Sequence, residues 1–455
     1  EDYVWNNTEV DIVLKNPEGF SMVFEKVTGQ KLRHPVLGIS TDSRELQNGD
    51  LYIALMGERV DGHKFLDSVE KSNASCALVS NVKHQLNLQQ VVVQDPLTMI
   101  GNIANAWRKQ FDIPVIGITG SNGKTSTKEL LIHVLSGTFN VHATEGNFNT
   151  TIGLPLTLLQ LNDENTISIL EMGASSPGEI GDLCKISEPT HGLITNIAPA
   201  HLEGFGSIET IAHEKGSLFR ALGKGISFVN QADEHVIGID ALGEKVTFGL
   251  TPDCDFPADI HQEDDGSLTL TLDSYEIPTG SQNLSFIKNS IAVTAMAVTL
   301  GVKWEKVVDR IQSFSPPPGR CQVKQFDDIT VIDDTYNANL ISSLAALDYL
   351  KAFAGNGRRI FVFGDMFELG AASHEQHRKV GNKCTELGLD VVFTLGDNTI
   401  HTDSVINSGI THQHFETHNA MIDSLKNIIH PGDKILFKGS RGMTMEKVIH
   451  GVFKI

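Results

Sequence analysis

Residues 115 to 131 read Val115-Ile116-Gly117-Ile118-Thr119-Gly120-Ser121-Asn122-Gly123-Lys124-Thr125-Ser126-Thr127-Lys128-Glu129-Leu130-Leu131, and this stretch decides the fold. Its first five residues are mostly apolar and β-branched, which is typical of a buried parallel strand. A glycine-containing turn follows, and then a helical pattern with Leu130, Leu131, Val134 and Leu135 on one face. The order of strand, glycine turn, Lys-Thr pair and helix predicts a loop that holds the phosphates of a nucleotide.

Each part of this loop has a predicted role. Glycines let backbone N–H groups curl around a phosphate chain, and the helix N-terminus adds a partial positive charge. We expect Lys124 to reach the β- and γ-phosphates and the Thr125 hydroxyl to ligate Mg²⁺. The predicted nucleotide-binding residues of the loop are Gly120, Ser121, Asn122, Gly123, Lys124, Thr125 and Ser126.

The loop departs from the general pattern G-x-x-x-x-G-K-[ST]. Ile118 stands where the first glycine belongs, and the glycines lie at 117 and 120. An ordinary glycine-rich turn between a strand and a helix is therefore the alternative interpretation. The turn, the Lys-Thr pair and the helix nevertheless occur together in the required order, which favours a nucleotide site.

The composition limits the classes of function. The chain has 455 residues, which predicts two to three domains. It carries 36 Lys and Arg against 56 Asp and Glu, so its formal net charge is −20. Such a balance argues against nucleic acid or an anionic membrane as the main partner. Anionic ligands must therefore be held by local groups such as Lys124 and backbone amides.

The same composition predicts a cytoplasmic protein without membrane insertion. No apolar run is long enough to span a bilayer, and no charged-then-apolar signal segment opens the chain. Five cysteines are scattered without a C-x-x-C pair, which is typical of reduced thiols and makes a zinc site unexpected.

Further polar residues follow predicted strands in the central part of the chain. Glu171 ends the buried strand that begins at Thr166, where open α/β sheets bind ligands and nucleotide enzymes place an acid that ligates Mg²⁺. A helix-capping Glu is the alternative. A lone histidine is usually structural, but His201 follows the strand at 192–197, which makes contact with metal or phosphate an alternative there. Asn147 and Asn149 lie in a polar turn whose role the residues alone leave open.

Without reference to any family, the N-terminal and C-terminal parts of the sequence indicate function less clearly than the phosphate loop does. Thr41, Ser43 and Arg44 form a hydroxyl-rich segment that can hold phosphate, although an ordinary polar turn is the favoured interpretation. Pro316-Pro317-Pro318 stops any helix and predicts a domain boundary. Short apolar strands beyond it, each followed by a polar or glycine turn, alternate with helical stretches and predict a second doubly wound α/β unit.

Taken together, the blocks resemble the Mur ligase family of ATP-dependent amide-forming enzymes. Thr119 to Thr125 match the family's own form of the loop, T-G-[ST]-x-G-K-T, which accounts for the departure from the general pattern. The more specific blocks are 333–339 (Asp-Asp-Thr-Tyr-Asn-Ala-Asn), 364–370 (Gly-Asp-Met-Phe-Glu-Leu-Gly) and 438–441 (Lys-Gly-Ser-Arg). They resemble the family members that add D-alanyl-D-alanine to UDP-N-acetylmuramoyl-tripeptide.

The resemblance implies a three-domain α/β fold. Its parts are an N-terminal domain for the UDP substrate at 1–112, a central phosphate-loop domain with a doubly wound sheet at 113–315, and a C-terminal Rossmann-like domain at 316–455. It implies ATP and two Mg²⁺ ions as cofactors, an acyl-phosphate intermediate, a role in peptidoglycan synthesis and a monomer.

The resemblance also implies roles for single residues. Lys124, His201 and Lys215 are the expected catalytic residues, with Lys215 carbamylated so that it bridges to a second Mg²⁺. The expected metal ligands are Thr125, Glu171, His201 and Lys215. Arg320 and Asp334 are expected on the nucleotide, with Asp334 on its ribose. The expected substrate contacts are Thr41, Ser43, Arg44, Asn147, Asn149, Tyr336, Asn337 and Asn339.

Three departures from the family pattern stand out. The adenine-contacting block G-x-H-N-x-x-N matches Gly280-Ser281-Gln282-Asn283 with a longer spacer to Asn289, which we expect to serve the nucleotide. Thr150 replaces the last Asn of an N-x-N-N turn, and Leu340 replaces a proline. None of these departures removes a residue that is expected to hold a phosphate or a metal ion.

Two alternatives remain open at this stage. One is a related Mur-type or folylpolyglutamate-type ligase with another acceptor. The other is a nucleotide switch, which needs a guanine-reading Asn-Lys-x-Asp motif, whereas the chain has Gln231 in place of the lysine.

Overall fold

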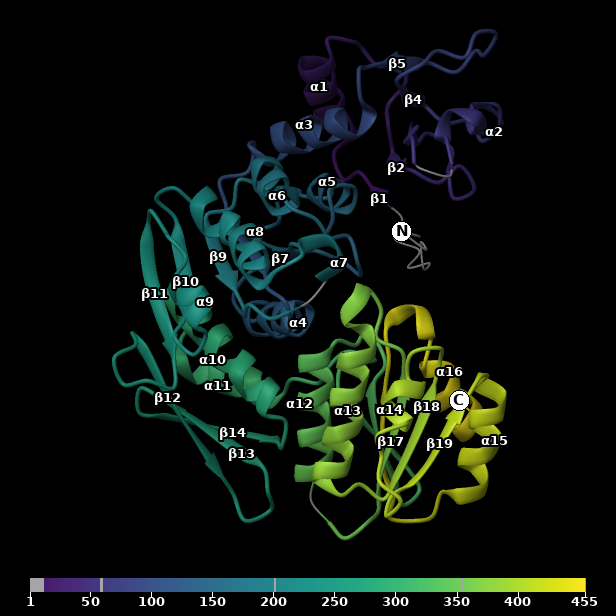
Figure 1. Cartoon of the computed structure of the whole chain (residues 1–455). Helices are drawn as coiled ribbons and strands as arrows, with labels where there is room; N and C mark the ends of the chain where they lie inside the picture. Colours follow the sequence, from purple (N-terminus) through teal and green to yellow (C-terminus); the bar gives the residue numbers. More distant parts are fainter. Residues whose placement is uncertain (1–11, 58–59, 200–201, 354, 455) are drawn as a thin grey trace.

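The computed structural model describes residues 12–57, 60–199, 202–353 and 355–454. Three β-sheets follow one another along the chain, and each is accompanied by helices (Figure 1). The N-terminal part lies at the top of the view, the central part at the left and the C-terminal part at the lower right. The predicted three-part α/β fold is thereby confirmed.

The N-terminal sheet has five strands in the order β1-β2-β3-β4-β5, parallel except for the antiparallel pair β1/β2. The strands are β1 (Ile12–Val13), β2 (Gly38–Ser40), β3 (Leu51–Ile53), β4 (Cys76–Val79) and β5 (Gln90–Val92). The helices are α1 (Pro17–Thr28), η1 (Gly62–Phe65), α2 (Leu66–Lys71) and α3 (Pro96–Arg108).

Helix α3 ties this part to the central part. Its Trp107 Nε1 donates to the Leu161 carbonyl at 3.1 Å, and Arg108 Nε donates to the Ser187 carbonyl at 2.9 Å. Apolar residues of both parts form one continuous core around the helix. The predicted division after residue 112 falls between α3 and the next strand, and it stays a prediction because α3 packs against both sides.

The central sheet has nine strands in the order β14-β13-β12-β11-β10-β9-β6-β8-β7. The strands are β6 (Val115–Thr119), β7 (Val141–Ala143), β8 (Ile167–Glu171), β9 (His191–Ile194), β10 (Ile226–Asn230), β11 (Glu244–Gly249), β12 (Phe256–Gln262), β13 (Leu268–Leu272) and β14 (Tyr275–Ser281). Strands β6 to β12 run parallel, and β12, β13 and β14 form antiparallel hairpins at one end of the sheet.

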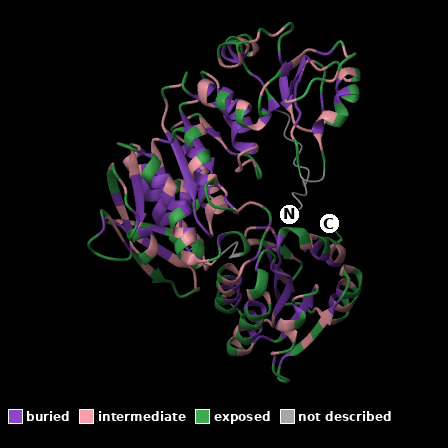
Figure 2. Cartoon of the chain, turned by 45° about the horizontal axis from the view of Figure 1, so that its top comes forward, coloured by how far each residue is buried: buried purple, intermediate pink, exposed green. Residues whose placement is uncertain are grey.

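Helices cover both faces of this sheet. They are α4 (Lys124–Leu135), α5 (Gly153–Leu158), α6 (Glu179–Ser187), α7 (Leu202–Phe205), α8 (Ile208–Ala221), α9 (Glu234–Ile237), α10 (Leu284–Thr299) and α11 (Trp304–Gln312). The apolar faces of α4 and α10 share one core with the sheet. Figure 2 shows the buried strands between more exposed helices and loops.

The C-terminal sheet has six strands in the order β15-β16-β20-β17-β18-β19, parallel except for the pair β15/β16. The strands are β15 (Gln322–Phe326), β16 (Ile329–Asp334), β17 (Arg359–Gly364), β18 (Val391–Leu395), β19 (Thr411–Phe415) and β20 (Lys434–Lys438). The helices are α12 (Leu340–Ala352), η2 (Gly370–Ala372), α13 (Ser373–Leu387), α14 (Ile400–Asp403), α15 (His418–Ile428), η3 (Arg441–Met443) and α16 (Glu446–Phe453).

The strand order of the central sheet indicates where a ligand is expected to bind. Strand β6 lies between β8 and β9, so the chain leaves β6 at a point where the connections diverge to both sides. In open α/β sheets, ligands bind in the crevice at such a point, at the carboxyl ends of the strands. Among the described residues, no helix is long and apolar enough to cross a membrane.

Candidate functional site

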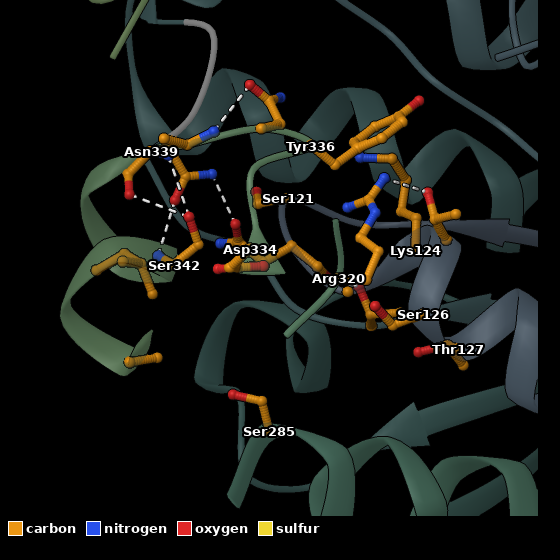
Figure 3. Close-up of a pocket in the computed structure, with 18 of the residues that line it drawn as sticks. Ser121, Lys124, Ser126, Thr127, Ser285, Arg320, Asp334, Tyr336, Asn339 and Ser342 are labelled. Atoms are coloured by element: carbon orange, nitrogen blue, oxygen red, sulfur yellow. Dashed lines mark hydrogen bonds between the residues drawn. The ribbon is translucent and has the colours of Figure 1, made fainter. Parts of the chain in front are cut away.

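A cavity of about 1190 Å³ opens at the carboxyl ends of β6 and β8 and extends to the C-terminal part of the chain. Its central wall includes the predicted phosphate loop and Glu171, and its opposite wall includes Arg320, Asp334 and Tyr336. Figure 3 shows side chains of both walls pointing toward one another. Residues almost 200 positions apart in the sequence thus share one site.

The glycines of the loop are required by its backbone. Gly120 has φ +145° and Gly123 has φ +80°, which lie in a region that favours glycine. A Cβ atom at Gly120 would overlap the Thr195 Oγ1 atom. The loop therefore adopts a path that a larger residue at 120 would disrupt.

The end of β9 fixes the loop in place. The Ser121 hydroxyl donates to the Ala198 carbonyl at 2.8 Å and accepts the Ala198 N–H at 2.9 Å. The Asn122 carbonyl accepts hydrogen bonds from the side chains of Thr195 and Asn196, at 2.6 and 2.9 Å. These contacts hold the loop through groups other than the N–H groups at the start of α4.

Helix α4 begins without a side-chain cap at Gly123. By contrast, Asn283 caps α10 and Asn339 caps α12 with side-chain oxygens. A helix start without a cap leaves the N–H groups of the first turn available to a ligand, and the helix dipole favours an anion there. The geometry at Gly123 is that of a phosphate-binding site.

Lys124 points back over this loop. Its Nζ donates to the Gly120 carbonyl at 2.9 Å. Burial lowers the pKa of Lys124, the nearby Glu171 carboxylate opposes this shift, and Arg320 adds to it. A half-buried cation beside the N–H groups at the start of α4 concentrates positive charge where a polyphosphate would lie.

Glu171 ends β8 and is almost fully buried. Its Oε1 accepts a hydrogen bond from Asn149 Nδ2 at 2.8 Å, whereas its Oε2 has no hydrogen-bond partner among the described residues. A buried carboxylate oxygen without a protein partner fits a ligand to a divalent cation. This hydrogen bond also positions Asn149, a predicted substrate contact, beside Glu171, the predicted metal ligand.

Of the other predicted metal ligands, Thr125 lines the same cavity as Glu171, and Lys215 lies on α8. His201 lies outside the described residues. Lys215 on α8 is 2 % exposed, and its Nζ lies 5.9 Å from the centroid of the Phe205 ring. Burial, together with the charge of Lys124, lowers the pKa of Lys215 to about 7. Within the described part of the chain, no three His, Cys, Asp or Glu side chains gather as a metal site.

The C-terminal part reaches the phosphate loop through two hydrogen bonds. Arg320 Nη2 donates to Thr125 Oγ1 at 2.9 Å, and Asn339 Nδ2 donates to Asn122 Oδ1 at 2.6 Å. The Arg320 guanidinium also stacks 3.8 Å above the centroid of the Tyr336 ring. In this structure Asn339 therefore contacts the loop and caps α12 with the same amide group.

Asp334 forms an ion pair that the sequence did not predict. Its carboxylate lies 2.5 Å from Lys438 Nζ, and it accepts the Cys321 N–H at 3.2 Å. Lys438 also donates to the Asn337 carbonyl at 2.9 Å. The pairing of β16 with β20 sets Asp334 opposite Lys438, so the sheet order is the signal that would have identified this pair.

Most of the predicted site residues line the cavity, whereas Gly120 and Lys215 are not among its lining residues and His201 lies outside the described residues. Those that line the cavity are Ser121, Asn122, Gly123, Lys124, Thr125, Ser126, Asn147, Asn149, Glu171, Asn289, Arg320, Asp334, Tyr336, Asn337 and Asn339. Thr41, Ser43 and Arg44 lie away from it, after β2 of the N-terminal sheet. There Arg44 contacts the Asp42 carboxylate at 2.5 Å, so its charge is already paired.

Substituting Gly120 tests the geometry of the loop. We expect Gly120→Ala to weaken the binding of ADP with Mg²⁺ by roughly tenfold or more, because both the backbone strain and the overlap with Thr195 distort the loop. Gly388→Ala is a matched control, since Gly388 also has a positive φ but lies in open space after α13. Calorimetric titration of both variants measures the effect, with circular dichroism as the check on folding. Equal affinity in the two variants would contradict this account of the loop.

Comparisons with known proteins agree with this architecture. Three family models match: "Mur ligase family, catalytic domain" at residues 35–108, "Mur ligase middle domain" at 118–297, and "Mur ligase, glutamate ligase domain" at 319–441. A UDP-N-acetylmuramoyl-tripeptide–D-alanyl-D-alanine ligase of Synechocystis is 36 % identical over 90 % of both chains.

Solved structures are similar over almost the whole chain. MurF from Acinetobacter baumannii has a TM-score of 0.87 at 30 % identity, covering 96 % of this chain and 98 % of its own. MurF ligase from Thermotoga maritima in complex with ADP has a TM-score of 0.82 at 27 % identity, covering 91 % and 97 %. The chain belongs to the Mur ligase family.

Proposed function

We propose that this protein joins D-alanyl-D-alanine to UDP-N-acetylmuramoyl-tripeptide, with ATP as the source of energy, in the synthesis of peptidoglycan precursors. One observation carries the proposal: the start of α4 and a Glu171 oxygen, both without a side-chain partner among the described residues, line one cavity shared with the C-terminal part. The relatives named for this reaction support the choice of substrates.

In the first step, the terminal carboxylate of the tripeptide attacks the γ-phosphorus of ATP. An acyl phosphate forms, and the bond from this phosphorus to the bridging oxygen of ADP breaks. Two anions must approach each other, so positive charge in a water-poor site supplies most of the stabilisation. Lys124 and the first N–H groups of α4 supply it from the central wall, and Arg320 supplies it from the opposite wall.

In the second step, the amine of D-alanyl-D-alanine attacks the carbonyl carbon of the acyl phosphate. The tetrahedral intermediate expels inorganic phosphate, the nitrogen loses its proton, and an amide remains. Water would destroy the acyl phosphate, so the site must close before this step. The Arg320–Thr125 and Asn339–Asn122 contacts hold the two walls together, and the linker at 316–319 provides the hinge.

We further propose that Mg²⁺ binds at Thr125, Glu171 and His201, with a second ion near Lys215. When bound, it neutralises phosphate charge and orients the γ-phosphoryl group. The unpartnered Glu171 oxygen supports the first position. The Arg320 guanidinium now occupies one side of the Thr125 hydroxyl, so this hydroxyl must exchange partners when the nucleotide arrives.

Carbamylation of Lys215 is part of the same proposal. A neutral amine adds to CO₂, loses one proton and becomes a carbamate, which is an anionic oxygen ligand. A pKa of about 7 leaves much of the amine neutral at physiological pH, because burial disfavours the ammonium form. The site of this chemistry is thus set by the apolar surroundings of α8.

The remaining assignments concern binding and location. Thr41, Ser43 and Arg44 bind the UDP diphosphate, for which Arg44 must release Asp42. Asn147, Asn149, Tyr336 and Asn337 contact the peptide substrates, and Asp334 binds the ribose. The protein acts as a monomer in the cytoplasm, in accordance with its five free cysteines and its net charge of −20.

The function is tested by release of phosphate from ATP with Mg²⁺, measured with each substrate omitted in turn. We expect release that requires both UDP-N-acetylmuramoyl-tripeptide and D-alanyl-D-alanine, and a matching amount of pentapeptide product. Release that requires a different amine would retain the ligase chemistry but change the acceptor. No release with any amine would contradict the ligase assignment.

The role of Lys215 is tested by Lys215→Ala, with the exposed Lys224 as a matched control. We expect Lys215→Ala to lose ligase activity that added bicarbonate does not restore, whereas Lys224→Ala stays near the wild type. In the wild type, ¹³C-bicarbonate should give a carbamate signal in NMR spectra that increases as the pH rises through 7, because the neutral amine is the reacting form. Full activity in Lys215→Ala would refute the assignment.

A further inference from the structure

The guanidinium of Arg320 lies at the cavity without a carboxylate partner. Its Nη2 donates to Thr125 Oγ1 at 2.9 Å, and the group stacks 3.8 Å from the centroid of the Tyr336 ring (Figure 3). Among the described residues, no Asp or Glu side chain forms an ion pair with Arg320. Arginines inside proteins are usually paired with an anion, so a ring here takes the place of the common partner.

Two carboxylates close to Arg320 are already paired with lysines. Asp334 accepts the N–H of the residue after Arg320, but its ion pair, at 2.5 Å, is with Lys438. Asp333 forms an ion pair with Lys324 at 2.7 Å. Because both carboxylates at the end of β16 have their own cation, the charge of Arg320 stays available for an anionic ligand.

The backbone places the Tyr336 ring against Arg320. The Tyr336 N–H donates to the Gly319 carbonyl at 3.1 Å, in the register of the antiparallel pair β15/β16. Gly319 has φ +74°, and a Cβ atom there would come within 3.2 Å of the Tyr336 nitrogen. The Asp333 carboxylate accepts the Thr335 hydroxyl at 2.7 Å and so fixes the start of the turn. The ring and the guanidinium therefore form one unit of the C-terminal part.

Stacking on a ring orients an arginine without neutralising it. The face of an aromatic ring attracts a guanidinium, yet it leaves the N–H groups at the edge of that guanidinium uncovered. Arg320 Nε is buried and has no hydrogen-bond partner within the described part of the chain. It shares one edge of the guanidinium with Nη2, which contacts Thr125 of the phosphate loop. An edge with two parallel N–H donors is the arrangement that holds two phosphate oxygens.

We propose that Tyr336 is a positioning residue, whose ring orients the Arg320 edge toward the γ-phosphoryl group of the nucleotide and leaves its charge free to act there. This inference rests on the proposed function, because it requires a nucleotide with its phosphates on the loop at Gly123. It adds to the peptide contact proposed for Tyr336, since it uses the ring face that Arg320 covers. The pair reaches the phosphates as a preformed unit when the two walls close, so little side-chain entropy is lost at that step.

Substitutions of Tyr336 in the full chain with Mg²⁺ test the role of the ring. We expect Tyr336→Phe to keep kcat within about threefold of the wild type, because the ring remains. Tyr336→Leu should lower kcat by roughly tenfold, with much smaller changes in KM for the tripeptide substrate and D-alanyl-D-alanine. Tyr275→Leu is the matched control, since Tyr275 stacks on Trp304 with centroids 4.7 Å apart but does not line the cavity. Circular dichroism checks the folding of each variant.

Fluorination of the ring separates the electrostatic contact from packing. Phenylalanine residues that carry an increasing number of fluorine atoms, placed at position 336, keep nearly the same shape while the negative charge on the ring face decreases. We expect the affinity for a non-hydrolysable ATP analogue to fall steadily along this series. The affinity for ADP, which lacks the γ-phosphate, should stay within about threefold, because Arg320 then has no γ-phosphoryl group to hold.

The outcomes distinguish this inference from the proposed function. Unchanged binding of the ATP analogue along the fluorinated series would overturn the inference and leave the ligase intact. A Tyr336→Leu variant whose defect is confined to KM for one of the peptides would also overturn it, because the ring would then serve the peptide alone. Failure of the wild-type chain to bind either nucleotide would overturn the nucleotide site and the inference together.

Discussion

The site depends on one constraint: the N–H groups at the start of α4 must stay free of protein partners. A helix start without a cap is unfavourable unless something else holds the chain there. In this structure the end of β9 does so, through Ser121 and the Asn122 carbonyl. The Asn122 side chain is in turn held by Asn339 of the C-terminal part. The phosphate site is therefore complete only when the sheet and both walls are in place.

Charge is distributed in accordance with this constraint. The chain is strongly acidic, and yet three lysines lie near the cavity or in its wall: Lys215 and Lys438 are buried, and Lys124 is half-buried. Each has a different environment: a loop carbonyl for Lys124, apolar contacts for Lys215, and the Asp334 carboxylate for Lys438. A low-dielectric surrounding strengthens the interaction of a charged lysine with an anion, which favours phosphate binding at Lys124. Lys215 differs, because its pKa is lowered to about 7 and its neutral amine is the group proposed to become a carbamate.

Local patterns in the sequence were sufficient for the strands, the phosphate loop and the positions of Glu171 and Arg320. They work because a strand, a glycine turn and a helix start are encoded within a few neighbouring residues. The Asp334–Lys438 pair and the Asn339–Asn122 contact were not predicted, since they join segments 104 and 217 positions apart that only the strand order and the closed arrangement bring together. Asn289 lines the cavity beside the phosphate loop, and its contact with the nucleotide stays a prediction. His201 lies outside the described residues, and its role stays a prediction.

In the proposed reaction, the two walls of the cavity activate a carboxylate by phosphorylation. Transfer of oxygen from this carboxylate to the released phosphate is the measurement that would show this step. With the terminal carboxyl group of the tripeptide labelled with ¹⁸O, the acyl phosphate retains one labelled bridging oxygen, which leaves with the phosphate when the amine attacks. We expect one ¹⁸O atom in each inorganic phosphate released during ligation. Unlabelled phosphate would mean that water or another nucleophile attacks ATP, and it would contradict the proposed chemistry.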